Sequence, residues 1–218
     1  MIVAFGWNEL LFIITSAGWT LLLTAIAFIS GGLAGGIFAL VRLSRLKILR
    51  RIAAVYIAVI QSIPVLMVLF LSYFGLYAAG LELPPLIAAS LSLGIYVSAY
   101  LAEIWRGSIE AVPFQQWEAS ESLAMTRGQQ YRYVILPQAA RISLPPTVGF
   151  LVQLVKNTSI VSVVGFIDLT RAGQLVNNAT FDPFPVFGAV AAIYFLICFP
   201  LSRLSRRFER ILNVGRIH

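Results

Sequence analysis

The sequence predicts an all-helical integral membrane protein with five membrane-spanning helices. Of the 218 residues, 59% are hydrophobic and only 11% are charged, whereas charged residues make up about 25% of an ordinary soluble domain. The charges leave long apolar runs at residues 10–41, 52–81, 83–102 and 183–202, and a fifth at residues 142–167 is interrupted only by Lys156. Each run reaches the roughly 20 residues that a helix needs to cross a bilayer core about 30 Å thick. A soluble globular protein is therefore excluded, and a single transmembrane domain over residues 1–218 is expected.

The first span is expected at residues 18–41. Residues 1–6 carry no cation and no small-residue cleavage site follows them, so a signal peptide is not expected. The glycines of residues 31–36 form a small-residue face, in which Gly32 and Gly36 make a G-x-x-x-G pair. Such a pair lets another helix approach closely, inside the bundle or in a second copy. Packing inside the bundle is the favoured interpretation.

The second run is interrupted by Gln61, Ser62 and Pro64. A proline in a membrane helix frees backbone carbonyls that other groups must satisfy, so it favours a bend. A bend is therefore expected at this point, with contact to a transported substrate as the alternative.

The distribution of cations predicts the orientation. Fourteen of the 16 Lys and Arg residues lie in the segments 42–51, 106–141 and 203–216. With five crossings these segments share one side, which the positive-inside rule identifies as the cytoplasm. The N-terminus is then outside and the C-terminus cytoplasmic. The net charge of +7 reflects this topology and the anionic headgroups of membrane lipid, and a nucleic-acid partner is not expected.

The segment between the third and fourth spans has the pattern of two short amphipathic helices. The first begins after Pro113 and carries Trp117, and the second is capped by Thr126, with Gln129 completing a capping box. Pro137 is expected to end the second helix. The pair either docks into a groove on another protein or lies on lipid headgroups.

The spacing of residues in this segment resembles a known family. Glu118-Ala119-Ser120, Ala124, Val134 and Leu136-Pro137 are spaced like the E-A-A-x3-G-x9-I-x-L-P loop of permease subunits of bacterial ABC importers. Residues 99–107, 135–141 and 154–159 resemble the polar amino acid branch of that family, and the similarity covers roughly residues 15–212. Ala124 in place of the motif glycine is the departure that matters, because glycine permits a tight turn.

The resemblance implies the type I permease fold of five transmembrane helices, in the bacterial plasma (inner) membrane. Two short cytoplasmic coupling helices would lie between spans three and four, within an EAA coupling loop at about residues 107–140. Contact with an ATPase subunit is then expected from one set of residues in that loop: Gln116, Glu118, Ala119, Ser120, Leu123, Ala124, Met125 and Arg127.

The resemblance also implies the activity and the partners. The chain would translocate a polar amino acid by alternating access, coupled to ATP hydrolysis through residues 114–137. Its partners would be two cytosolic ABC ATPase subunits, a second permease subunit that is identical or homologous, and an extracytoplasmic substrate-binding protein. No cofactor is expected on this chain and it is not expected to be an enzyme, because ATP-Mg belongs to the partner subunits. In agreement, the glycines of residues 31–36 are followed by Ile37 and Phe38 rather than by the Lys and Ser/Thr of a phosphate-binding loop.

Ionisable residues inside the spans are candidates for the substrate path, because an unpaired charge there is costly. Lys156 lies near the middle of the fourth span, and contact with a substrate carboxylate and structural pairing are equally favoured. Glu103 and Arg106 are three residues apart on one helical face, and a structural pair is favoured over binding of a substrate ammonium. The candidate path comprises Glu103, Arg106, Lys156, Asn157, Thr158, Ser159, Gln61, Ser62 and Pro64.

Two rival classes remain open. A secondary, ion-coupled transporter or channel-like bundle needs carboxylates in its spans, and Glu103 is the one candidate. A non-transporting scaffold is disfavoured by the two-helix loop. Outside the loop, Cys198 is expected to be a packing residue, His218 to lie in a disordered tail, and Asp168 to form a solvated ion pair with Arg171. No metal site is expected.

Overall fold

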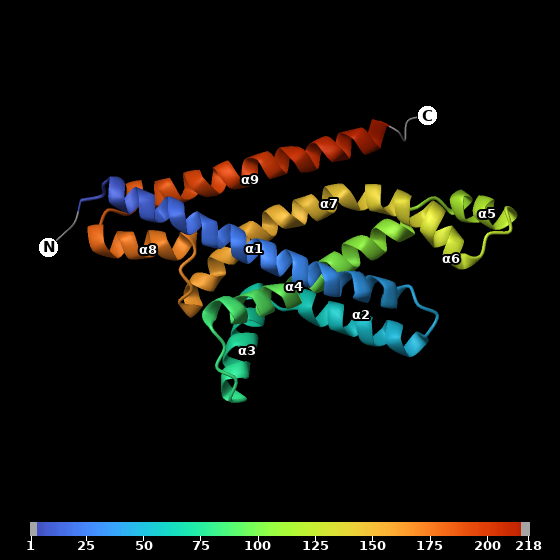
Figure 1. Ribbon diagram of the computed structural model, residues 1–218, viewed down its shortest axis with the longest axis horizontal. Helices are drawn as coiled ribbons and strands as arrows, with labels where there is room; N and C mark the ends of the chain where they lie inside the picture. The colour runs from blue at the N-terminus through green and yellow to red at the C-terminus, as the bar shows by residue number, and fades with distance from the viewer. Residues whose placement is uncertain (1–3, 215–218) are drawn as a thin grey trace.

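The computed structural model describes residues 4–214, with side chains as far as residue 212, and this part of the chain consists of helices and their connections (Figure 1). In chain order the elements are α1 (Trp7–Arg42), α2 (Lys47–Ser62), α3 (Val65–Ala78), α4 (Pro85–Glu110), α5 (Phe114–Ser122), α6 (Arg127–Gln129), the π-helical turn η1 (Gln130–Ile135), α7 (Leu136–Asn157), the 3₁₀ helix η2 (Thr158–Val164), α8 (Leu169–Thr180) and α9 (Pro183–Val214).

The predicted all-helical membrane fold is confirmed. Four segments of the described chain have the length and apolar composition to cross a membrane by themselves: α1, α4, the continuous α6–η1–α7–η2 segment, and α9. The fifth predicted span is the pair α2 and α3, which meet at an angle of 107°. The expected bend at residues 61–64 is therefore confirmed, and it breaks the span into two helices. Pro64 is the N-cap of α3, so its missing N–H falls where no intrahelical partner is needed.

Helix α4 lies at the centre of the bundle. In its most apolar stretch 67% of the residues are buried, against 17% for α9. The main apolar core joins α1, α3, α4, α7 and η2 through the fully buried side chains of Leu23, Leu69, Val97, Leu154 and Val161. Hydroxyl groups also link α4 to a neighbouring helix. Ser98 in α4, for example, lies 2.7 Å from the Tyr56 hydroxyl of α2.

The closest approach between α1 and α4 occurs at Gly31 and Gly35. A Cβ added to Gly31 would lie 2.6 Å from the backbone oxygen of Gly94, and one added to Gly35 would lie 2.9 Å from that of Ser98. Packing inside the bundle is thus confirmed. The predicted pair Gly32 and Gly36 is the wrong pair, because it faces the Trp105 ring and has room for a methyl group.

Pro137 does not end the second loop helix, so that prediction is wrong. Helix α6, the turn η1 and α7 form one continuous helical segment, with Pro137 in the first turn of α7. The wider π-helical turn at residues 130–135 precedes the proline. A proline is tolerated at this position because the π-helical turn changes the hydrogen-bonding pattern just before it, so the missing N–H of Pro137 costs little.

The connection between α7 and α9 folds back against the bundle, where α8 lies beside α1 and α9 and η2 contacts α1 (Figure 1). Asp168 caps α8, and its Oδ1 accepts a hydrogen bond of 2.8 Å from the Arg171 backbone N–H. The Arg171 side chain instead donates to Gln174. The predicted solvated ion pair between Asp168 and Arg171 is therefore wrong, because the carboxyl group is needed inside the fold as a helix cap.

Two further predictions concern α9 and the C-terminus. Cys198 is buried beside Val152 and Val155 of α7, which confirms it as a packing residue. The predicted tail at His218 lies outside the described residues.

Candidate functional site

The two loop helices project from one end of the molecule, beyond the adjoining ends of α4 and α7 (Figure 1). The first begins at Phe114, directly after Pro113, as predicted. The predicted capping box is also confirmed, because the Thr126 N–H donates to Gln129 Oε1 at 2.8 Å and the Gln129 N–H donates to Thr126 Oγ1 at 3.4 Å. Local sequence signals therefore determine where both helices start.

Ala124 forms the turn between the two helices in the left-handed conformation, with φ of 54°. The Ala124 N–H donates to the Glu121 oxygen at 2.8 Å, and the Met125 N–H donates to the Ser120 oxygen at 3.3 Å. This pair of bonds is the Schellman arrangement, whose left-handed position is usually occupied by glycine. The turn thus has the backbone conformation that the motif glycine would adopt freely, and alanine adopts it at a cost.

An apolar cluster joins the loop to the bundle. Val112 at the end of α4 and Ile135 in η1 are buried together, and Trp117 of α5 and Tyr131 of η1 pack against them. The Trp117 and Tyr131 rings meet edge to face, with centroids 5.2 Å apart. Gln138 Nε2 of α7 also donates to Gln116 Oε1 of α5 at 3.3 Å. Packed contacts therefore connect α5 to the base of α7.

The predicted contact residues divide into an exposed set and an inner set. Ser120 is buried, and its hydroxyl donates to the Trp117 carbonyl at 2.8 Å. Met125 and Arg127 line a hollow of about 480 Å³ between the loop and the end of α4. The side chains open to solvent are Gln116, Glu118, Ala119, Leu123, Ala124 and also Arg127, which lies at the exposed edge of the hollow. Leu123 is 76% exposed, which is a large apolar exposure at the tip of a projecting helix.

The charged residues at the loop-side end of α4 form a network. Arg106 Nε donates to both oxygens of Glu103 at 3.0 Å, and its guanidinium also pairs with Glu110. Arg42 of α1 lies 4.0 Å from Glu103. The favoured structural pair is therefore present, with Glu103 held between cations of two helices.

The helix type changes within residues 156–159. Helix α7 ends at Asn157 and the 3₁₀ helix η2 begins at Thr158. The Lys156 side chain is exposed, and within residues 4–214 it takes part in none of the three salt bridges. Thr158 and Ser159 donate to carbonyls three residues earlier, while the buried Asn157 Nδ2 has no hydrogen-bond partner.

A polar surface between α4 and α7 includes Tyr100 and Gln153, and the Tyr96 ring is buried in the main core beside it. Tyr96 and Tyr100 lie on the same face of α4 as Glu103, at intervals of four and three residues. Gln153 of α7 points its amide toward the Tyr96 hydroxyl at 3.4 Å. Gln153 could have been predicted from the sequence, because it is a polar amide residue in an apolar run, three residues before Lys156.

The break between α2 and α3 is tied to the same helix. Gln61 Nε2 donates to the Ala99 carbonyl of α4 at 3.4 Å, whereas Ser62 and Pro64 are exposed. Gln61 thus anchors the broken span to α4 beside Tyr100.

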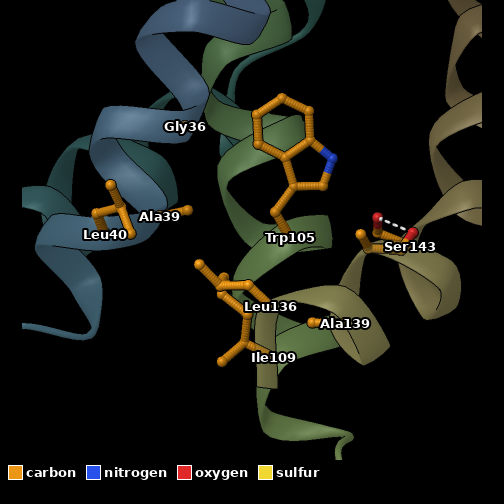
Figure 2. A pocket seen from close by; sticks show the side chains of 9 residues that line it. Gly36, Ala39, Leu40, Trp105, Ile109, Leu136, Ala139 and Ser143 are labelled. Atoms are coloured by element: carbon orange, nitrogen blue, oxygen red, sulfur yellow. Dashed lines mark hydrogen bonds between the residues drawn. The ribbon is translucent and has the colours of Figure 1, made fainter. Parts of the chain in front are cut away.

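A separate apolar pocket of about 370 Å³ opens between α1, α4 and α7 (Figure 2). Its hydroxyl group, that of Ser143, donates to the Ala140 carbonyl at 2.9 Å. The pocket offers no charged group for the ammonium or carboxylate of an amino acid, so it is not a candidate site for a polar substrate. Its lining residues are Gly36, Ala39, Leu40, Trp105, Ile109, Leu136, Ala139, Ala140 and Ser143.

Metal binding has no support in the described chain. Among residues 4–214, three or more His, Cys, Asp or Glu side chains nowhere gather closely enough to hold a metal ion.

Comparison with known proteins identifies the family. Residues 31–214 match the family described as binding-protein-dependent transport system inner membrane component. The chain belongs to this family. It is therefore a multi-pass inner membrane permease of the ABC transporter class, as the loop motif predicted.

Individual relatives are similar over nearly their whole length. The probable amino-acid ABC transporter permease protein YckA of Bacillus subtilis is 34% identical over 207 residues, which are 95% of this chain and 90% of that protein. The glutamine transport system permease protein GlnP of Escherichia coli is 34% identical over 95% of this chain and 96% of that protein. A crystal structure of an amino acid ABC transporter with histidines is 40% identical, with a TM-score of 0.87 over 91% of this chain and 93% of that one.

A more distant structure shares the fold. A structure of the MetNI methionine ABC transporter in an inward-facing conformation has a TM-score of 0.71 at 19% identity, covering 91% of this chain and 93% of that chain.

Proposed function

We propose that this permease is the membrane-spanning subunit of an ATP-driven importer for a polar amino acid. The observation that carries the proposal is the projecting α5–α6 unit, whose exposed face bears the family's loop motif while its inner face packs against the base of α7. Relatives named as glutamine and amino-acid permeases support the substrate class.

In this assignment the chain forms one transmembrane domain over residues 1–218, with its N-terminus outside and its C-terminus in the cytoplasm. Two cytosolic ATPase subunits bind ATP-Mg and contact the loop of residues 114–137, so catalysis takes place on those subunits. A second permease completes the pathway, and an extracytoplasmic binding protein delivers the amino acid. Closure of the ATPase subunits moves α5, and the packed contacts with η1 and α7 carry that movement to the spans.

The proposed substrate path runs along the polar surface between α4 and α7. Lys156 has the charge to meet a substrate carboxylate, and Asn157 has an unpartnered amide beside it. The Tyr96 and Tyr100 rings of α4 stack against Phe150 of α7 beside this surface, with Tyr96 buried in the main core. Transport would proceed by alternating exposure of this surface to the two sides of the membrane.

Co-purification from native membranes in mild detergent tests the assignment. We expect two ATPase subunits and two permease chains, with ATP hydrolysis that rises when binding protein and a polar amino acid are added. Recovery of the chain without ATPase subunits, together with ion-driven uptake, would overturn the proposal in favour of a secondary transporter.

Charge reversal at Glu118 tests the loop contact. Glu118→Lys should weaken binding of the ATPase subunit on the order of tenfold, because reversing a charge in an interface places it opposite a like charge. Subunit retention and stimulated ATP hydrolysis are the measurements. Glu82→Lys makes the same charge change at an exposed site between α3 and α4 and should leave both unchanged. Equal behaviour of the two variants would remove Glu118 from the contact.

Removal of the Lys156 charge tests the path. Lys156→Met should reduce amino acid uptake roughly tenfold while the complex still assembles, since a charge that meets a desolvated carboxylate contributes strongly to binding. The other lysine in the chain, Lys47, is exposed at the start of α2, and Lys47→Met is the matched control. Normal uptake by Lys156→Met, with unchanged substrate affinity, would place Lys156 outside the path.

A further inference from the structure

Four arginines form a stripe along the last turns of α9. Arg206 and Arg207 follow Arg203 by three and four residues, and Arg210 follows them by four and three, so the four arginines lie on one face of the helix, and all four are exposed. None of the three salt bridges in the described part of the chain involves them. With Pro200 and Leu204 they line a surface hollow of about 790 Å³.

The opposite face of this end of α9 packs against the bundle. Ser205 donates its hydroxyl to the Pro145 carbonyl of α7 at 2.9 Å. That contact fixes the rotation of the helix, so the arginine stripe faces away from α7 and is open to a partner.

Exposed apolar side chains continue the same face toward the middle of α9. Phe195, Leu196 and Phe199 precede Arg203 by eight, seven and four residues, which places them in line with the stripe. Phe195 is 59% exposed and Leu196 is 69% exposed. The Arg203 guanidinium lies 5.0 Å from the centroid of the Phe199 ring, so the cationic and apolar parts of the face are continuous.

The length of α9 places the boundary between these parts at a membrane surface. The helix begins at Pro183, and twenty residues at 1.5 Å each bring it to Arg203 after about 30 Å, the thickness of a hydrocarbon core. The arginines thus start at the depth of lipid phosphates, and the exposed aromatic rings lie at the depth of acyl chains.

We propose that the α9 stripe, with the apolar side chains in line with it, is a binding site for an anionic phospholipid. The arginines bind the headgroup phosphate, for which the guanidinium group is well shaped, and the acyl chains lie along Phe199, Leu196 and Phe195. An acidic protein surface would explain the arginines alone. A lipid explains both the cations and the aligned apolar side chains.

Lipid retention by the purified complex tests the site. The assembled transporter is titrated with dioleoylphosphatidylglycerol or dioleoylphosphatidylcholine, and bound lipid is counted by native mass spectrometry. We expect the phosphatidylglycerol to bind at least roughly tenfold more tightly, since each cation near a membrane surface contributes to attraction of anionic lipid. Equal binding of the two lipids by the unmodified complex overturns the proposal without any variant.

Paired substitutions then locate the site. Arg206→Gln combined with Arg210→Gln should lower phosphatidylglycerol binding roughly tenfold, and Arg206→Lys with Arg210→Lys should retain most of it. Arg50→Gln with Arg51→Gln removes two exposed cations from α2 and should have little effect. An equal loss in the α2 variant would show general charge attraction, which overturns the site.

Two other outcomes would also overturn it. If inorganic phosphate displaced bound phosphatidylglycerol as effectively as added phosphatidylglycerol does, the arginines would be assigned to a free anion. Loss of a protein subunit from the Arg206→Gln/Arg210→Gln complex, with lipid binding unchanged, would assign the stripe to a protein contact.

Discussion

The α4–α7 connection and the α7–α9 connection are both built from short helices, and they differ in what covers them. Ser120 is the one buried residue of α5, which projects from the end of the molecule (Figure 1). In α8, by contrast, Leu169, Ala172 and Val176 are buried against α1 and α9. A buried connection contributes to the stability of the bundle, whereas an exposed one retains a surface for a partner.

Polar groups are treated differently in the two connections. The Leu169 N–H of α8 donates to Thr20 Oγ1 of α1 at 3.0 Å, which ties the connection to a distant helix. The Thr126 cap of α6 is satisfied within its own turn by Gln129. The α7–α9 connection therefore depends on the bundle for its shape, while the α4–α7 connection carries the signals for its own shape.

The largest expected effect comes from filling the contact between α8 and α9. A Cβ on Gly173 would lie 2.6 Å from Val190 Cγ2, whereas one on Gly128 of α6 would meet nothing within 4 Å. Gly173→Leu should destabilise the protein by about 3 kcal/mol because of overpacking. The thermal midpoint of the detergent-solubilised protein measures this effect. Gly128→Leu is the control and should change the midpoint little. An equal fall in the thermal midpoint of Gly128→Leu would contradict the difference between the buried and the exposed connection.

The next effect concerns the buried cap of α8. Burial raises the pKa of Asp168 from 3.8 to about 6, and its Oδ2 has no hydrogen-bond partner. A pKa raised by folding contributes stability that is complete below the unfolded value and is lost as the pH rises through the folded one. Stability of the unmodified protein should therefore decline between pH 4 and pH 7, by up to about 3 kcal/mol from this group.

Replacement by an amide isolates that contribution. Asp168→Asn keeps a capping side chain but removes the titration, so its thermal midpoint should vary less with pH over the same interval. Asp182→Asn, at the exposed far end of α8, is the control and should retain the original slope. Parallel profiles for the unmodified protein and Asp168→Asn would rule out Asp168 as the source.

The smallest effect is expected in the exposed connection. Ala124→Gly should stabilise the α5–α6 turn by about 1 kcal/mol, because glycine adopts the left-handed conformation without a Cβ penalty. Ala119→Gly in the middle of α5 should have the opposite sign and a similar size. Hydrogen exchange of the backbone amides in residues 114–126 measures both, and the same direction of change in the two variants would contradict the role of the Ala124 conformation.

Local signals in the sequence predicted the loop better than the buried connection. The helix start after Pro113 and the capping box at Thr126 depend on residues within a few positions of each other. The failed predictions for the glycine pair and for Asp168 involve distant contacts. The glycines closest to the α4 backbone are Gly31 and Gly35, and Asp168 is buried by helices that its neighbours in sequence do not specify.

The sequence by itself determined the membrane class, the family and the start of each loop helix, because apolar length, motif spacing and capping are local properties. Only the tertiary structure decided which face of each helix is covered. It also set the angle of the expected bend in the second span at 107°. It also aligned Tyr96, Gln153 and Asn157 between α4 and α7. These outcomes depend on how helices far apart in the chain pack, since a helical face becomes buried only when a partner helix lies against it.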